Sequence, residues 1–254
     1  SGLFKSLLRF RPRMRSEWLS ILTAVYVLVF LNTTFWDKSV AYLNGDVMAL
    51  LALGVGIFAI FIALFVSLSV KYLTKPVLIL LVLASVAGAW FMDRFGVIID
   101  SEMVRNAVET NQAEAGHLIT RAFILHMVVF GILPSLFIAS VDIVHRPILK
   151  KVAVNLMIII PCLLVFALAG YSQSGTFTFN IRQHRDWFHT LNPLFPIGSA
   201  AKLFIRKGEE QTIVAQPLGT DARVVDDTKN VDRKPRVTIV VVGETARAAN
   251  FQLG

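Results

Sequence analysis

The sequence predicts an all-α polytopic membrane domain with five transmembrane helices, followed by the start of a soluble α/β domain. Of the 254 residues, 55% are hydrophobic and only 17% are charged, which is more apolar than an ordinary soluble domain. Five apolar stretches are each long enough to cross a hydrocarbon core, which needs about 20 helical residues. Basic residues gather beside alternate helix ends, as they do in multi-pass membrane proteins.

Each apolar stretch predicts one transmembrane helix. A buried core helix would explain any single stretch, but five of them within 171 residues leave too little polar surface to solvate a globule. Pro76 suits a helix start, where the missing N–H costs nothing. The expected spans are residues 17–36, 47–70, 76–92, 122–142 and 152–171.

The net charge of +8 could suggest nucleic-acid binding, but the basic residues do not interleave with exposed aromatic residues. They indicate topology instead, because cytoplasmic segments carry an excess of Lys and Arg. We therefore expect a multi-pass inner-membrane protein with a cytoplasmic N-terminus, a first span that acts as a signal anchor, and everything after Tyr171 on the outer side. The basic residues are Lys5, Arg9, Arg11, Arg13, Arg15, Lys71, Lys75, Arg146, Lys150 and Lys151.

The polar segment 97–120, between the third and fourth spans, predicts an amphipathic helix at the outer membrane surface. Within it Asn106, Thr110 and Glu114 recur every four residues. Side chains at this spacing project from nearly one face, with a drift of about 40° per step. The spacing alone is typical of a solvated polar face, so it permits a binding site without showing one.

Residues 172–235 predict a membrane-surface bridging segment and a linker. In the stretch 177–208, Phe, Trp, Arg and His alternate with short apolar runs, a composition that suits the lipid headgroup zone. We expect this stretch to lie on the bilayer. Residues 209–235 are charged, contain turn formers and show no periodicity, which is typical of a linker.

Residues 236–254 predict the first strand and turn of an α/β domain. The run VTIVVV suits a buried parallel strand, and ligands bind outside the carboxyl ends of such strands. Glu244 lies at that end, either as a metal ligand or as an ordinary capping residue. One strand cannot bury a core, so we expect the soluble domain to be truncated at Gly254.

The order of these features resembles the phosphoethanolamine transferases that modify lipid A, a family that includes the mobile colistin-resistance enzymes. The resemblance rests on VVVGETARAANF and NAVETNQAE, with IRQHRDWFHTLNP as weaker support. It implies that a periplasmic alkaline-phosphatase-like domain carrying zinc follows the membrane domain.

The resemblance also implies residue roles. Glu244 matches the first zinc ligand of the family, and Asn106, Thr110 and Glu114 match residues that bind the phosphoethanolamine headgroup. The nucleophilic threonine and the other zinc ligands of the family would lie beyond this sequence, so we expect no catalytic residue in it and an inactive chain. One departure is Phe95, where the family usually has tyrosine.

The implied reaction moves phosphoethanolamine from phosphatidylethanolamine, the donor, to a phosphate of lipid A, the acceptor, through a phosphothreonine at the zinc site. The added amine offsets phosphate charge, so the product should bind cationic polymyxins less well. A related headgroup transferase with another acceptor would have a similar membrane domain. A non-enzymatic transporter or channel subunit is a further alternative, for which the intramembrane polar residues are Asn32, His126 and Asn155.

Overall fold

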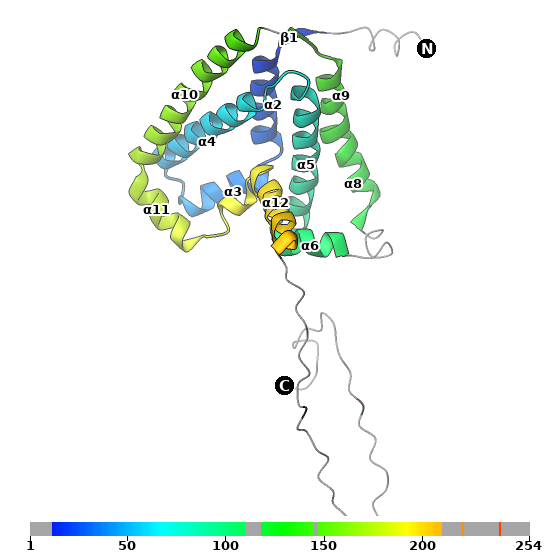
Figure 1. The fold of residues 1–254 in the computed structure, drawn as a ribbon. Helices are drawn as coiled ribbons and strands as arrows, with labels where there is room; N and C mark the ends of the chain where they lie inside the picture. The colour runs from blue at the N-terminus through cyan, green and yellow to red at the C-terminus, as the bar shows by residue number, and fades with distance from the viewer. Residues whose placement is uncertain (1–11, 110–117, 145–146, 210–219, 221–238, 240–254) are drawn as a thin grey trace, which may run out of the picture. The chain divides into compact units, whose positions relative to one another are not determined.

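The computed structural model describes residues 12–109, 118–144, 147–209, 220 and 239. The chain divides into two units, Ser1–Glu210 and Gln211–Gly254. The described part of the first unit is a helical bundle with one short pair of strands (Figure 1). The strand and turn predicted for residues 236–254 lie outside the described residues, apart from position 239.

The described residues contain four or five candidate membrane spans, where the sequence predicted five. Four helical segments are long and apolar enough to cross a membrane, and α2 (Ser16–Phe30) with α3 (Thr33–Tyr42), bent by 61°, gives the fifth if the pair is one span. The other spans are α4 (Val47–Ser67), α5 (Thr74–Phe95), the segment Arg121–Ser140, and α10 (Ile148–Ser172).

The first span is not the straight helix that the sequence predicted over residues 17–36. The backbone leaves helical geometry at Leu31 and Asn32. The Asn32 side chain donates to the carbonyl of Val27 at 3.0 Å, and its other contacts reach a segment far along the chain. An asparagine that bonds to nearby backbone groups competes with the helix, which gives a physical reason for the bend.

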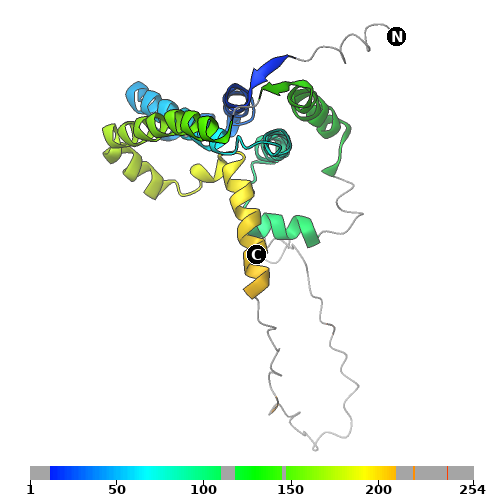
Figure 2. The ribbon, with the colours of Figure 1, turned by 45° about the horizontal axis from the view of Figure 1, so that its top comes forward.

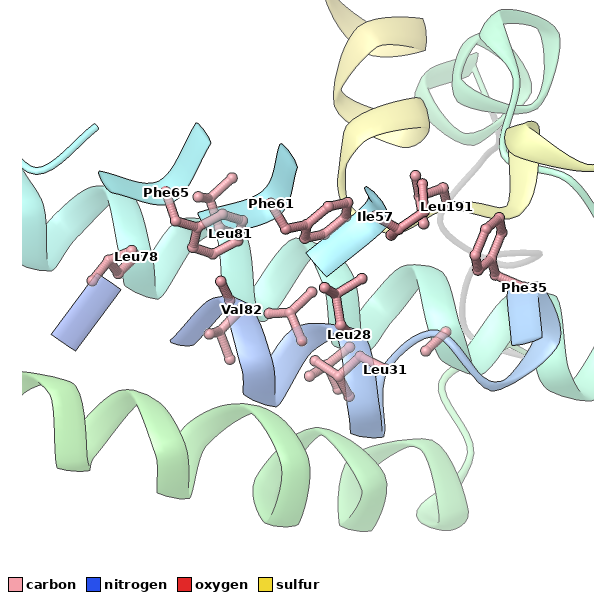
Figure 3. Close-up of a cluster of buried hydrophobic side chains, with 14 of the residues drawn as sticks. Leu28, Leu31, Phe35, Ile57, Phe61, Phe65, Leu78, Leu81, Val82 and Leu191 are labelled. Atoms are coloured by element: carbon pink, nitrogen blue, oxygen red, sulfur yellow. The ribbon is translucent and has the colours of Figure 1, made fainter. Parts of the chain in front are cut away.

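The centre of the bundle is formed by α2, α4 and α5, whose apolar side chains interlock (Figure 3). Leu28, Phe61 and Val82, one from each helix, are fully buried. Helix α10 packs along α4, yet none of its residues, 148–172, is buried, so its outer face is left for lipid. The two helices come close at Gly56, where a Cβ would lie 3.4 Å from the Cβ of Ala169.

The fourth span contains a π-helical turn. It consists of α8 (Arg121–His126), the π-helix Met127–Ile132 and α9 (Leu133–Ser140). In a π-helical turn the backbone hydrogen bonds run from residue i to i+5 and replace the regular α-helical pattern. The Tyr26 hydroxyl of α2 donates to the carbonyl of Phe130 in this turn at 2.7 Å, and so ties the fourth span to the first.

Strand β1 (Arg13–Arg15), strand β2 (Asp142–Val144) and the basic helix ends share one end of the bundle, at the top of Figure 1. The two strands pair in parallel, with Met14 opposite Ile143. Lys75 Nζ donates to the carbonyl of Ala139 at 2.8 Å, which joins the start of α5 to the end of α9. We call this the basic end.

The opposite end carries the surface helices (Figure 2). They are α6 (Ser101–Glu109), α11 (Ser174–Gln183), the 3₁₀ turn Phe188–Thr190 and α12 (Leu194–Glu209). We call this the surface-helix end.

Candidate functional site

Helix α6 carries the candidate site residue that the structure describes. Asp100 starts the helix by accepting the backbone N–H of Met103 at 2.8 Å, and Asn106 is exposed. A helix therefore exists over Ser101–Glu109, whereas the sequence predicted one over residues 97–120, and residues 97–100 are not helical. Thr110 and Glu114 lie outside the described residues, as does Glu244, so their grouping with Asn106 stays a prediction.

Helix α6 rests on α12, and α12 is held by an amide network at its start. The side chain of Asn32 donates to the carbonyl of Asn192 at 3.0 Å and accepts the Asn192 N–H at 2.7 Å. The Asn192 side chain in turn donates to the carbonyl of Leu31 at 3.2 Å. Gly88 of α5 allows this approach, because a Cβ there would lie 2.5 Å from the Asn192 side-chain oxygen. The bend in the first span thus places hydrogen-bonding groups that hold the start of α12 in position.

Trp187 is the second anchor of the same segment. Its ring is fully buried, its Nε1–H donates to the hydroxyl of Ser39 at 2.9 Å, and it stacks on Phe35. The sequence placed this tryptophan among lipid headgroups, and that expectation was wrong for the side chain. The bend in the first span creates an internal partner for the indole, and a buried indole N–H needs such a partner. Whether the outer faces of α11 and α12 lie on the bilayer stays a prediction.

An ion pair makes the third anchor, nearer the surface. Lys38 Nζ lies 2.5 Å from a carboxylate oxygen of Asp186, and the Tyr42 hydroxyl donates to the same oxygen at 3.2 Å. The hydrogen bond from Lys38 holds the pKa of Asp186 below its ordinary value, against a smaller opposing effect of burial. Helix α3 therefore binds the turn before α12 through an ion pair, Lys38 with Asp186, and through the aromatic contact of Tyr42 with Trp187.

The end of α5 is held to the same helix. Asp93 accepts hydrogen bonds from the hydroxyls of Thr33 and Thr34. Helix α5 ends at Phe95, and Gly96 after it adopts a left-handed conformation with φ of 63°. Helix α6 follows shortly after this turn. Helix α3 therefore holds both the end of α5, which precedes α6, and the segment before α12, on which α6 packs.

His184 and His189 at the surface-helix end stack on aromatic rings. His184 stacks on Tyr42 with ring centroids 3.8 Å apart, and His189 stacks on Phe195 at 4.0 Å. Among the described residues, no group of three or more His, Cys, Asp or Glu side chains could hold a metal ion. The described part of the chain therefore does not fit a zinc centre.

Sequence reasoning missed the residues that seat α12, namely Lys38, Ser39, Asp186 and Asn192. Asp186 and Asn192 lie in the quoted segment IRQHRDWFHTLNP, whose density of polar and aromatic residues was the available signal. Their partners in α2 and α3 lie about 150 residues earlier, and no local pattern announces contacts at that separation.

The intramembrane polar residues hold helices together. Asn155 donates to the carbonyl of Val66 at 3.2 Å, and so joins α10 to the end of α4. His126 lies against the rings of Trp90 and Phe130. With Asn32 used at the bend, each of the three residues has a packing role between helices.

Comparison with known proteins identifies the family. The family model described as phosphoethanolamine transferase EptA/EptB matches residues 57–207, which is more than half of the chain. The chain belongs to this phosphoethanolamine transferase family. Among its relatives, phosphatidylethanolamine transferase Mcr-1 of Escherichia coli is 33% identical over 89% of this chain and 42% of its own length. Mcr-2 of Escherichia coli is 31% identical over 91% of this chain and 43% of its own length.

This chain matches a similar share of the length of less similar relatives. Phosphoethanolamine transferase EptA of Escherichia coli K12 is 28% identical over 99% of this chain and 46% of its own length. The solved lipooligosaccharide phosphoethanolamine transferase A of Neisseria meningitidis has a TM-score of 0.75 at 20% identity, over 82% of this chain and 41% of that chain. That likeness shows a shared membrane-domain fold. The chain spans less than half the length of these relatives.

Proposed function

We propose that this chain is the membrane domain of an enzyme that moves phosphoethanolamine from phosphatidylethanolamine to lipid A. The observation that supports this most strongly is the family match, together with a surface helix that presents Asn106 beside the membrane-spanning bundle. The domain would hold the donor lipid at the height where a soluble catalytic domain could reach its headgroup. The catalytic domain would begin within residues 236–254.

The proposed headgroup site consists of Asn106, Thr110 and Glu114. A phosphodiester needs hydrogen-bond donors, which an amide and a hydroxyl supply, and an ammonium needs a carboxylate. We assign the ammonium to Glu114. The amide network around Asn32 and Asn192 would act at a distance, by seating α12 and hence the helix that carries Asn106.

Zinc would be held mainly outside the described residues. Family membership implies the ion in the complete enzyme, where it would supply electrophilic activation of a phosphoryl group. Glu244 is the ligand that the resemblance to the family nominates. What the described residues provide is the position of the lipid.

We further propose that the basic end faces the cytoplasm and the surface-helix end faces the periplasm of a bacterial inner membrane. The support is that β1, Lys75 and Lys151 all lie at one end of the bundle, since cytoplasmic ends are rich in Lys and Arg. Lipid A receives its modification on the periplasmic side under this proposal.

The decisive test compares Glu114→Ala with Glu109→Ala in the complete enzyme. Glu114 continues the face of Asn106 and Thr110, whereas Glu109 is about 100° away from Thr110. Losing one charge-assisted hydrogen bond of roughly 1.5 to 3 kcal/mol should slow headgroup release about tenfold to a hundredfold. The measurement is release of labelled phosphoethanolamine from phosphatidylethanolamine in nanodiscs, with lipid A as acceptor.

Glu109→Ala is the matched control and should change the rate little. Equal losses from the two variants would refute the headgroup assignment. Normal release without transfer to lipid A, but with transfer to another acceptor, would place the protein with a related headgroup transferase.

Topology is tested separately by cysteine labelling. With Cys162 replaced by Ser, a Ser172→Cys variant at the end of α10 should react with a membrane-impermeant maleimide from the periplasmic side. A cysteine at exposed Tyr72, in the turn before α5, should react only after the membrane is opened. The reverse pattern would overturn the proposed orientation while leaving the fold intact.

A further inference from the structure

An apolar groove lies between α4, α10 and α11, away from the proposed headgroup site. Its walls include Ala52 and Gly56 of α4, Phe166 and Gly170 of α10, and Phe177 of α11. The groove has a volume of about 260 Å³. A water-sized group occupies about 30 Å³, so the groove has room for a chain of several methylenes.

Small residues explain why the groove exists. At Gly56 the two long helices touch, because a Cβ there would meet Ala169 at 3.4 Å and Phe166 at 3.6 Å. Gly170 follows Ala169 directly and also lines the groove, and a Cβ there would meet nothing within 4 Å. The space next to Gly170 is therefore open, close to the start of α11.

An open surface hollow, with more apolar than polar lining, continues the groove along α11. It has a volume of about 600 Å³, and Ser174, Thr178 and Arg182 line it at a spacing of four residues. Side chains at this spacing share one face of the helix. Ser174 and Thr178 border both the hollow and the groove, so a single elongated molecule can occupy the two together.

We propose that this combined site binds one diacyl phospholipid of the surrounding bilayer, with an acyl chain in the groove and its phosphate at Arg182. The groove opens beside α10, whose residues are all accessible to lipid. An exposed arginine complements a phosphate, and the serine and threonine hydroxyls add donors. An apolar groove that leads to one arginine and two hydroxyl groups matches the acyl chain and the phosphate of a phospholipid.

This position is separate from the proposed donor site. In both ribbon views α11 and α6 lie apart, with α12 between them (Figures 1 and 2). The proposal does not depend on the headgroup chemistry, because it uses only the phosphate and the acyl chain. It stands if the assignment of Asn106 and Glu114 fails.

The test is native mass spectrometry of the delipidated chain in detergent, titrated with dioleoyl phosphatidylglycerol. Gly170→Leu fills the groove without meeting protein, and it should weaken binding of the tightest lipid at least about tenfold, since the acyl chain loses its place. Gly54→Leu is the matched control, because it is also a helical glycine with open space around it, outside the groove. It should leave the affinity unchanged.

Arg182→Gln should weaken the same lipid by about fivefold, as expected for one exposed charge contact. Arg185→Gln is the control, an exposed arginine outside the hollow. With dioleoylglycerol, which lacks the phosphate, Arg182→Gln should have no effect while Gly170→Leu still weakens binding. The two Arg182→Gln measurements, with and without the lipid phosphate, test the proposal even if Gly170→Leu does not fold.

Three results would overturn the proposal. The first is equal behaviour of Gly170→Leu and Gly54→Leu. The second is an effect of Arg182→Gln that is the same with and without the lipid phosphate. The third is a dimer of the chain that Gly170→Leu abolishes, which would show that a second copy fills the groove.

Discussion

Polar side chains join the helices at both ends of the bundle, but the two ends use different chemistry. At the basic end, Lys151 lies 3.1 Å from Glu17 and donates to the hydroxyls of Ser16 and Ser69, each at 2.7 Å. The side chains of this pair are only 17% and 6% exposed. One lysine thus connects α2, the end of α4 and α10.

At the surface-helix end, neutral amides take the buried positions and the ion pair lies outside. Asn32 and Asn192 are each 1% exposed, whereas the Lys38 and Asp186 side chains are 28% and 38% exposed. A buried neutral amide that loses its hydrogen-bond partner costs less free energy than a buried carboxylate that loses its counter-charge. The comparison implies that removing one polar side chain lowers the free energy of unfolding more at the basic end than at the surface-helix end.

The largest effect is expected for Lys151→Met. It leaves the buried Glu17 without its lysine, and breaking one side of a buried ion pair costs about 3 to 5 kcal/mol. Thermal unfolding in detergent should show this loss, and Lys150→Met, an exposed neighbour, should cost little. Adding Glu17→Gln to Lys151→Met should recover part of the stability. A mild effect of Lys151→Met would remove the distinction between the two ends.

An intermediate effect is expected for Asn32→Ala. The change removes two donated bonds and leaves the buried N–H of Asn192 unpaired, which should cost about 2 kcal/mol. Asn155→Ala, which removes a single bond to Val66, should cost about 1 kcal/mol or less in the same unfolding assay. In the complete enzyme, Asn32→Ala should also slow transfer, because α12 and α6 lose their seat. Equal losses of stability would show that the network at the bend has no special role.

The smallest effect is expected for the exposed ion pair. Lys38→Met should cost less than about 1 kcal/mol, as exposed pairs generally do. Its clearest signature is the response to acid. Because the pKa of Asp186 is held low in the folded protein, this pair stabilises the fold above the ordinary pKa of about 3.9, and the contribution is lost as pH falls through the lower folded value.

The pH test compares the wild-type chain with Asp186→Asn. Tryptophan fluorescence, to which the buried Trp187 contributes, should follow unfolding between about pH 5 and pH 2, across the range where ordinary and lowered carboxyl groups titrate. The stability difference between the two chains should shrink across this range and vanish at its acid end. A difference that persists at the acid end would show that Asp186 acts by packing and not by charge.

The spans could be predicted from sequence because each one is a local property. A helix satisfies its own backbone groups, so about 20 apolar residues suffice to specify a crossing wherever the neighbours lie. The same holds for α6, which begins after Asp100 as a polar helix between two apolar runs. The bend at Asn32 was missed because the polar residue there looked like one of several within a long apolar stretch.

The candidate site depends on contacts that no local pattern specifies. The sequence alone determined the membrane class, the number of spans, the clustering of basic residues, and the family through its motifs. Only the tertiary structure decided that Trp187 is buried, that Asn192 meets Asn32, and that α12 supports the helix of Asn106. The physical reason is that apolarity and periodicity act within one segment, whereas a hydrogen bond between residues 160 positions apart exists only after the bundle brings both partners together.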